Sequence, residues 1–188
     1  MAMSLIDDAY PRDLVMTAAI FGVAAFVWSG WAQERPPRAV VWRVVLAGLG
    51  VIGLVAAGFA IPLAVRHWSA GTAMRFQGTA WVAYLIVVAI EVVACVALVV
   101  WVTLARRSDL IAPLILAVVG IHFVPLAFVF GQPIMAWAGV ALTVIAVVAA
   151  LLPASDIARS FWCGLFGAPV LLLAAIPCLL VGRAALAS

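Results

Sequence analysis

Six long apolar segments, separated by short polar connections, make up most of this chain and strongly constrain its fold. The segments span residues 14–31, 44–65, 80–104, 110–130, 134–152 and 161–181. Each is close to the roughly 20 apolar residues that a helix needs to cross a bilayer. Backbone groups at membrane depth must bond within a helix or a closed barrel, and continuous apolarity without alternation excludes the barrel. The sequence therefore predicts an all-α, polytopic transmembrane bundle of six helices.

The composition leaves little for a soluble domain. The mean hydropathy is +1.34, and 9% of the 188 residues are charged, against roughly a quarter in soluble proteins. We expect a single membrane domain over residues 1–188, with the lipid bilayer as its partner. The arginines are dispersed among the connections and form no basic stripe, so we expect no nucleic-acid partner.

The connections carry helix-stop and turn residues. Gly131-Gln132-Pro133 predicts a tight turn that makes the fourth and fifth helices antiparallel neighbours. All eight tryptophans lie at or near segment ends, as the aromatic belt at a membrane interface predicts. Four polar residues directly precede apolar segments and are predicted N-caps, namely Asp13, Thr79, Asp109 and Ser160.

Orientation follows from the arginines in the connections, because cytoplasmic loops carry an excess of positive charge. One side holds Arg35, Arg38, Arg43, Arg106, Arg107 and Arg159. The other side holds Arg12, Arg66, Arg75 and Arg183. The larger group predicts the cytoplasmic side, so both termini are expected outside, in a multi-pass protein of a bacterial inner membrane.

One ionisable residue breaks this layout. Of the Asp, Glu and Arg side chains, only Glu91 lies within an apolar segment, at the centre of the third. A carboxylate in hydrocarbon is costly unless it is protonated or paired, so such a residue marks a functional site by default. Glu91 is therefore the first candidate site residue.

His122 is predicted to lie opposite Glu91. The connection between the third and fourth segments is short, so these helices should run antiparallel and in contact. At about 1.5 Å rise per residue, Glu91 lies roughly 21 Å and His122 roughly 20 Å from that connection. Pro125 lacks an N–H and frees the carbonyl of Ile121 beside His122. The candidate proton or substrate site is therefore Glu91, His122, Pro125 and Ile121.

Two hypotheses explain this pair. The leading one is a small carrier or channel whose transport is coupled to protonation of Glu91 and His122, because Glu/His chains serve as proton relays. The alternative is a non-transporting accessory or assembly subunit in which the contact only locks two helices together. The sequence identifies no substrate.

Missing motifs argue against an enzyme. The chain has no HExxH or GxSxG motif, no lysine for a Schiff base and one deep histidine, where a membrane haem usually needs two axial ligands. The cysteines Cys95, Cys163 and Cys178 show no metal-ligand spacing and are expected to be buried small side chains. We expect no catalytic residue, no metal and no cofactor.

Small residues in the second segment allow two interpretations. Gly53 and Ala57 form a small-xxx-small pair, which either builds the face of a homo-oligomer or lets helices of the same chain approach closely. We favour packing within the chain.

The stretch from Gly120 to Phe130, GIHFVPLAFVF, carries a G-x-H-F-x-P-L-A-x-x-F motif. It resembles a signature of uncharacterised small bacterial six-helix integral membrane proteins. With the turn and Gly-containing helix that follow, the resemblance covers about one third of the chain. It implies the fold and the membrane location, and no activity.

A shorter stretch, Ala83 to Val93, is similar to the first helix of small multidrug transporters, which carries a proton-exchanging glutamate. Those proteins have four helices, with the glutamate in the first. Glu91 belongs to the third predicted helix, so we interpret this likeness as chance.

Overall fold

The structure is a computed structural model that describes residues 5–74, 78–153 and 155–187, and every regular element in these ranges is helical. The elements are α1 (Pro11–Trp31), α2 (Val40–Arg66), α3 (Thr79–Leu104), the short 3₁₀ helix η1 (Ser108–Leu110), α4 (Ile111–Phe130), α5 (Pro133–Leu151) and α6 (Arg159–Ala187). Six helices are long and apolar enough to cross a membrane. The prediction of an all-α, six-helix transmembrane protein is confirmed.

The helices extend beyond some of the predicted apolar segments. α2 begins at Val40 rather than at residue 44, and α6 continues to Ala187 rather than ending at 181. Both extensions include an arginine, Arg43 or Arg183. A boundary drawn from hydropathy alone ends the predicted segment at such a residue. The helix can nevertheless continue, because a long arginine side chain near a helix end reaches the polar interface while the backbone stays helical.

The four predicted N-caps are wrong, because each residue lies inside a helix rather than before it. Asp13 lies in the first turn of α1, Thr79 is the first residue of α3, Asp109 lies in η1 and Ser160 lies in the first turn of α6. Asp13 and Ser160 use their side chains for contacts with distant segments. α1 instead begins with Pro11, whose fixed φ and missing N–H suit the first helical turn.

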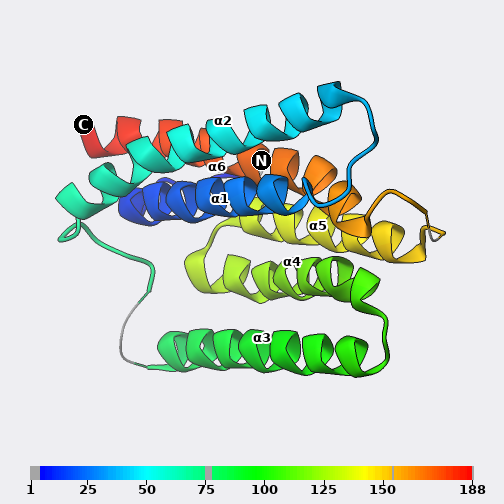
Figure 1. Cartoon of the computed structure of the whole chain (residues 1–188). Coiled ribbons are helices and arrows are strands. Elements are labelled where there is room, and N and C mark those ends of the chain that lie inside the picture. Colours follow the sequence, from blue (N-terminus) through cyan, green and yellow to red (C-terminus); the bar gives the residue numbers. More distant parts are fainter. Residues whose placement is uncertain (1–4, 75–77, 154, 188) are drawn as a thin grey trace.

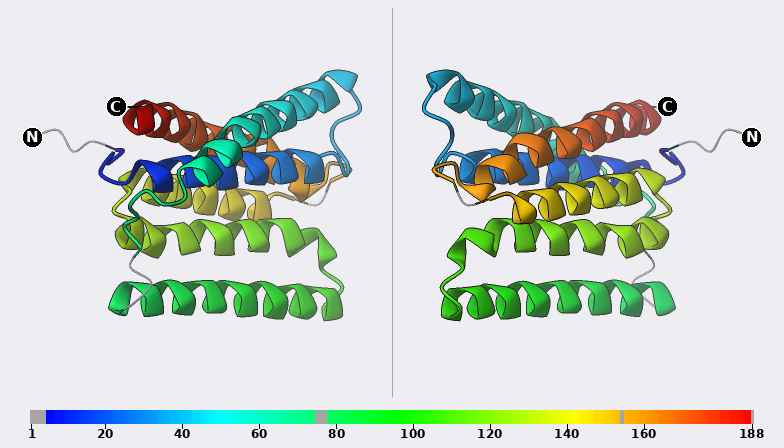
Figure 2. Two further views of the ribbon diagram at one scale, coloured as in Figure 1. Left: turned by 90° about the vertical axis from the view of Figure 1, so that its left-hand side faces the viewer. Right: turned by 90° about the vertical axis from the view of Figure 1, so that its right-hand side faces the viewer.

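The helices pack side by side, as Figure 1 shows. α1 packs extensively against α2 and α6, and α4 against α5. α5 also contacts α6, which joins the two groups. Figure 2 shows α2 and α6 crossing at one side of the molecule, while α3 lies at the opposite edge beside α4.

Glycines allow the closest helix crossings. A Cβ on Gly22 of α1 would lie 2.7 Å from the carbonyl oxygen of Gly53 in α2 and 3.3 Å from Cβ of Ala57. Likewise, a Cβ on Gly120 of α4 would lie 2.7 Å from the carbonyl oxygen of Gly139 in α5. Gly53 and Ala57 therefore serve helix packing within the chain, as we favoured, because small residues let backbones approach.

α3 is held differently from the other helices. It is the most apolar of the six and the least buried, and α4 is the long helix on which it packs. Its outer face exposes residues such as Ile90, at 63%, and Val93, at 67%. In a bilayer this face contacts lipid. α3 is therefore attached to the bundle mainly through α4.

The arginines separate into two groups at opposite ends of the helices. The ends of α1 and α3 and the starts of α2 and α6 carry one predicted group. The other predicted group lies at the start of α1 and the ends of α2 and α6, apart from Arg75, which falls outside the described residues. Which group faces the cytoplasm stays a prediction.

Candidate functional site

Glu91 and His122 meet between α3 and α4, near the centre of both helices. Nδ1 of His122 lies 2.7 Å from Oε2 of Glu91, although the two groups are not aligned as a linear hydrogen bond. The side chain of His122 is 11% exposed and that of Glu91 is 22% exposed. The structure thus brings together the two residues for which the sequence predicted equal depth.

The pair lies in almost entirely apolar surroundings. Within α3, α4 and α5, the other titratable side chains are Tyr84 and Cys95, both on α3. Cys95 follows Glu91 by one helical turn and so lies on the same side of α3. It is half-buried, whereas Cys163 and Cys178 are buried as predicted. No arginine or second carboxylate occurs in these three helices to neutralise Glu91.

Aromatic packing fixes the histidine side of the pair. The ring of His122 meets the ring of Phe123 edge to face, with centroids 5.2 Å apart. Phe123 is buried and contacts Phe21 of α1, with centroids 4.8 Å apart. α4 is therefore anchored to the central helix α1 next to His122. The glutamate side of the pair, on α3, has no comparable anchor to α1 among the described contacts.

The pair can hold its proton in two ways without net charge. A protonated Glu91 beside a neutral His122, and an ionised Glu91 beside a protonated His122, contain the same number of protons. Net charge appears only when a proton is added to the pair or removed from it, and an unpaired charge in a low-dielectric environment is costly. The contact can therefore bind, pass on or release a single proton.

Ile121 and Pro125 lie on a different side of α4. Their side chains line a shallow apolar pocket together with residues of α5, including Val140 and Thr143. Neither Glu91 nor His122 lines it, and neither lines the three other pockets described among residues 5–74, 78–153 and 155–187. The structure thus brings two of the four candidate residues into contact and separates the side chains of the other two from them.

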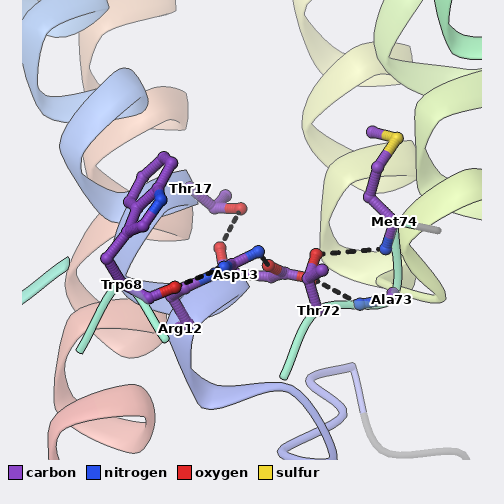
Figure 3. Close-up of polar contacts among 7 residues, drawn as sticks. All are labelled: Arg12, Asp13, Thr17, Trp68, Thr72, Ala73 and Met74. Atoms are coloured by element: carbon purple, nitrogen blue, oxygen red, sulfur yellow. Dashed lines mark hydrogen bonds and ion pairs between the residues drawn. The ribbon is translucent and has the colours of Figure 1, made fainter. Parts of the chain in front are cut away.

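A second polar cluster, at the start of α1, was not predicted (Figure 3). Arg12 and Asp13 are buried, at 7% and 4% exposure. The Arg12 guanidinium donates a 2.7 Å hydrogen bond to the carbonyl of Trp68 and lies over its ring, 5.2 Å from the centroid. One carboxylate oxygen of Asp13 accepts hydrogen bonds from the Thr72 hydroxyl, at 2.9 Å, and the Ala73 N–H, at 2.8 Å.

This cluster fastens the connection between α2 and α3 to α1. Both buried charges are paired, because Arg12 lies 3.6 Å from Asp13 and each has further polar partners. From the sequence we interpreted the two residues separately, Asp13 as an N-cap and Arg12 as one of the arginines that set the orientation. The partners lie 56 to 60 positions later in an irregular connection, where periodicity predicts no register.

Comparisons of the chain with protein-family models, with curated proteins and with solved structures found no match. The function of the site is therefore inferred from its own residues and geometry.

Proposed function

We propose that this protein is a small carrier or channel whose transport is coupled to protonation of Glu91 and His122. The observation that carries the proposal is their direct contact at the centre of two apolar helices. An ionisable pair at this depth is typical of proton pathways in membrane proteins. A purely structural contact between helices averages less than about 1 kcal/mol, which is a small gain for a residue as costly as a membrane carboxylate.

The way in which α3 is attached to the bundle supports a movement of α3 relative to α4 at this site. The His122 side of the pair is anchored through Phe123 to α1, whereas α3 packs mainly on α4. A change in the protonation of the pair alters the main polar contact between α3 and α4. Protonation is thereby linked to the separation or approach of two helices, as a proton-coupled carrier requires.

We also propose that the protein spans a bacterial inner membrane with both termini outside. Six spans support a multi-pass membrane protein. The resemblance of the motif from Gly120 to Phe130 to small bacterial six-helix proteins supports a bacterial inner membrane. The group of six arginines at one end supports the orientation with both termini outside.

Proton flux into liposomes tests the proposal without knowledge of the substrate. The full chain is reconstituted with a pH-sensitive dye inside, and a potassium gradient with valinomycin drives protons inward. We expect wild-type flux above that of protein-free liposomes. Glu91→Gln keeps the side-chain shape but has no carboxyl proton to exchange, so its flux should fall to the protein-free level.

Tyr84→Phe is the matched control. Tyr84 lies on α3 two turns before Glu91, and the substitution keeps the ring that packs against Phe130 while removing one hydroxyl. This variant should conduct protons like the wild type. Equal flux through wild type and Glu91→Gln at every pH between about 5 and 8, the range in which histidine titrates, would contradict a proton-coupled role.

The second candidate function is a non-transporting accessory or assembly subunit. It is favoured by the exposed outer face of α3 and by the separation of the pair from the described pockets. In this role the contact fixes α3 on α4. Glu91→Gln would then leave flux unchanged and lower the thermal stability, so the same variant distinguishes the two functions.

A further inference from the structure

A polar pocket lies at the arginine-rich end of the bundle. It has a volume of about 260 Å³ and is formed by the connection after α1, the start of α4 and the start of α6. Its charged lining residues are Glu34, Arg35, Asp109 and Arg159. Two arginines and two carboxylates leave the lining without net charge while presenting both signs to a ligand.

Most of these charges are held in place. Arg159 pairs with Asp109, and the Ser160 hydroxyl donates a 2.8 Å hydrogen bond to Glu34. The backbone carbonyl of Arg35 accepts a hydrogen bond from the Ala158 N–H at 3.0 Å. The Arg35 guanidinium, in contrast, is exposed and has no ion-pair partner among the described residues. The pocket therefore keeps one cation available for an anionic group.

An apolar groove begins beside this pocket. It has a volume of about 290 Å³, lies between α5 and α6, and has an entirely apolar lining that includes Leu152, Trp162, Val148 and Phe166. Val148 and Phe166 are each more than half exposed. Along α5 the lining extends from Leu152 to Val144, roughly 12 Å at about 1.5 Å per residue. The groove therefore runs along the helices, toward the hydrocarbon core.

Arg159 connects the polar pocket to the apolar groove. Its guanidinium pairs with Asp109, which lines the polar pocket, and donates a 2.7 Å hydrogen bond to the carbonyl of Leu152, which lines the groove. A polar pocket with positive and negative side chains thus adjoins the apolar groove at the end of the transmembrane helices. This is the arrangement of a lipid, with a charged headgroup at the interface and an acyl chain in the hydrocarbon region.

We propose that these two pockets together bind a phospholipid with a zwitterionic ethanolamine headgroup. The phosphate lies against Arg35, and the helix starts at Ile111 and Arg159 add favourable partial charge. The ammonium donates hydrogen bonds to Glu34, and one acyl chain occupies the groove between α5 and α6.

The charge balance distinguishes this lipid from others. An anionic glycerol headgroup would bring a net negative charge close to the Glu34 carboxylate and supply no cation to balance it, which is unfavourable. A choline headgroup has a cation but no N–H donor for that carboxylate. Of these three headgroups, only ethanolamine supplies both a phosphate for Arg35 and a hydrogen-bonding cation for Glu34.

Native mass spectrometry of the detergent-purified full chain tests the headgroup site. The protein is titrated with palmitoyl-oleoyl lipids that carry ethanolamine, choline or glycerol headgroups, and bound lipids are counted. We expect tightest binding of the ethanolamine lipid. Arg35→Ala should weaken it about tenfold, as the loss of a hydrogen bond to a charged group does. Arg38→Ala, in the same connection but outside the pocket lining, is the control and should bind like the wild type.

A second pair of variants tests the groove. Val148→Trp fills the groove, whereas Val147→Trp places the same ring on an exposed position of α5 outside its lining. We expect loss of the ethanolamine lipid in the first variant only. Equal binding of the three lipids, equal effects of Arg35→Ala and Arg38→Ala, or full binding by Val148→Trp would each overturn the proposal.

Discussion

At the scale of single residues, Glu91 and His122 depend on each other. Removing His122 alone leaves a carboxyl group among apolar side chains without its partner, at a cost of about 1–3 kcal/mol. Replacing both residues by leucine removes both polar groups and keeps the volume. We therefore expect His122→Leu to lower the thermal unfolding temperature in detergent.

The double variant Glu91→Leu, His122→Leu is the companion measurement. It should recover most of the stability that His122→Leu loses, because an apolar replacement of a buried pair is often neutral or stabilising. Destabilisation by the double variant equal to the sum of the losses in Glu91→Leu and His122→Leu would show that the pair does not act as a unit.

The residues of the motif that begins at Gly120 have separate roles. Gly120 allows α4 to approach α5, His122 contacts Glu91, and Phe123 packs on Phe21 of α1. The contact of Glu91 with His122 was predictable, because a short connection and a fixed rise per residue place both at one depth. The pocket that Ile121 and Pro125 share with α5 was not predictable, because it depends on which face of α4 packs against α5, and no pattern in the sequence specifies that face.

At the scale of helices, the crossing of α4 and α5 depends on Gly120. A Cβ at this position would lie 2.7 Å from the carbonyl oxygen of Gly139, so Gly120→Ala must push the two helices apart. We expect a loss of about 1–3 kcal/mol in unfolding free energy, as for other overpacked sites. Gly48→Ala in α2 is the control, because a Cβ there meets nothing within 4 Å. Equal stability of both variants would contradict the tight crossing.

Asp13 is predicted to hold the connection between α2 and α3. Asp13→Ala removes the acceptor for Thr72 and Ala73 and leaves the buried Arg12 without its carboxylate. The expected loss is about 3–5 kcal/mol, as for a broken buried ion pair. Chemical denaturation of the purified protein measures it, with the exposed Asp8→Ala as control. A loss no larger than that of the control variant would argue against a role of Asp13 in holding this connection.

The sequence predicted which segments form helices far better than it predicted which helices pack against each other. Long apolar segments leave no alternative to a helix at membrane depth, so the six helices were predictable from the position and length of those segments. The close packing of α1 on α6 was not, because both are apolar on many sides and no pattern selects the contacting face. The predicted N-caps were wrong for a related reason. The side chains of Asp13 and Ser160 form hydrogen bonds with segments far away in the sequence, and no local pattern predicts such partners.

At the scale of the whole molecule, six spans place both termini on one side of the membrane. We expect a cysteine at Asp8 to react with a membrane-impermeant maleimide in intact cells, because the arginine count puts the termini outside. A cysteine at Ala39, at the arginine-rich end, should react only after permeabilisation. Reversed labelling would contradict the orientation, and labelling of both from the same side would contradict six alternating spans.

The proposed transport depends on a proton that Glu91 exchanges with water while it contacts His122. Infrared difference spectroscopy of the reconstituted protein, comparing wild type with Glu91→Gln, measures this carboxyl group directly and needs no substrate. We predict one carboxyl C=O band that is absent from the variant and that weakens as the pH is raised from about 5 to 8. An imidazole ordinarily changes its charge over this range. A band of constant intensity over that range, or no band assignable to Glu91, would contradict the proposal.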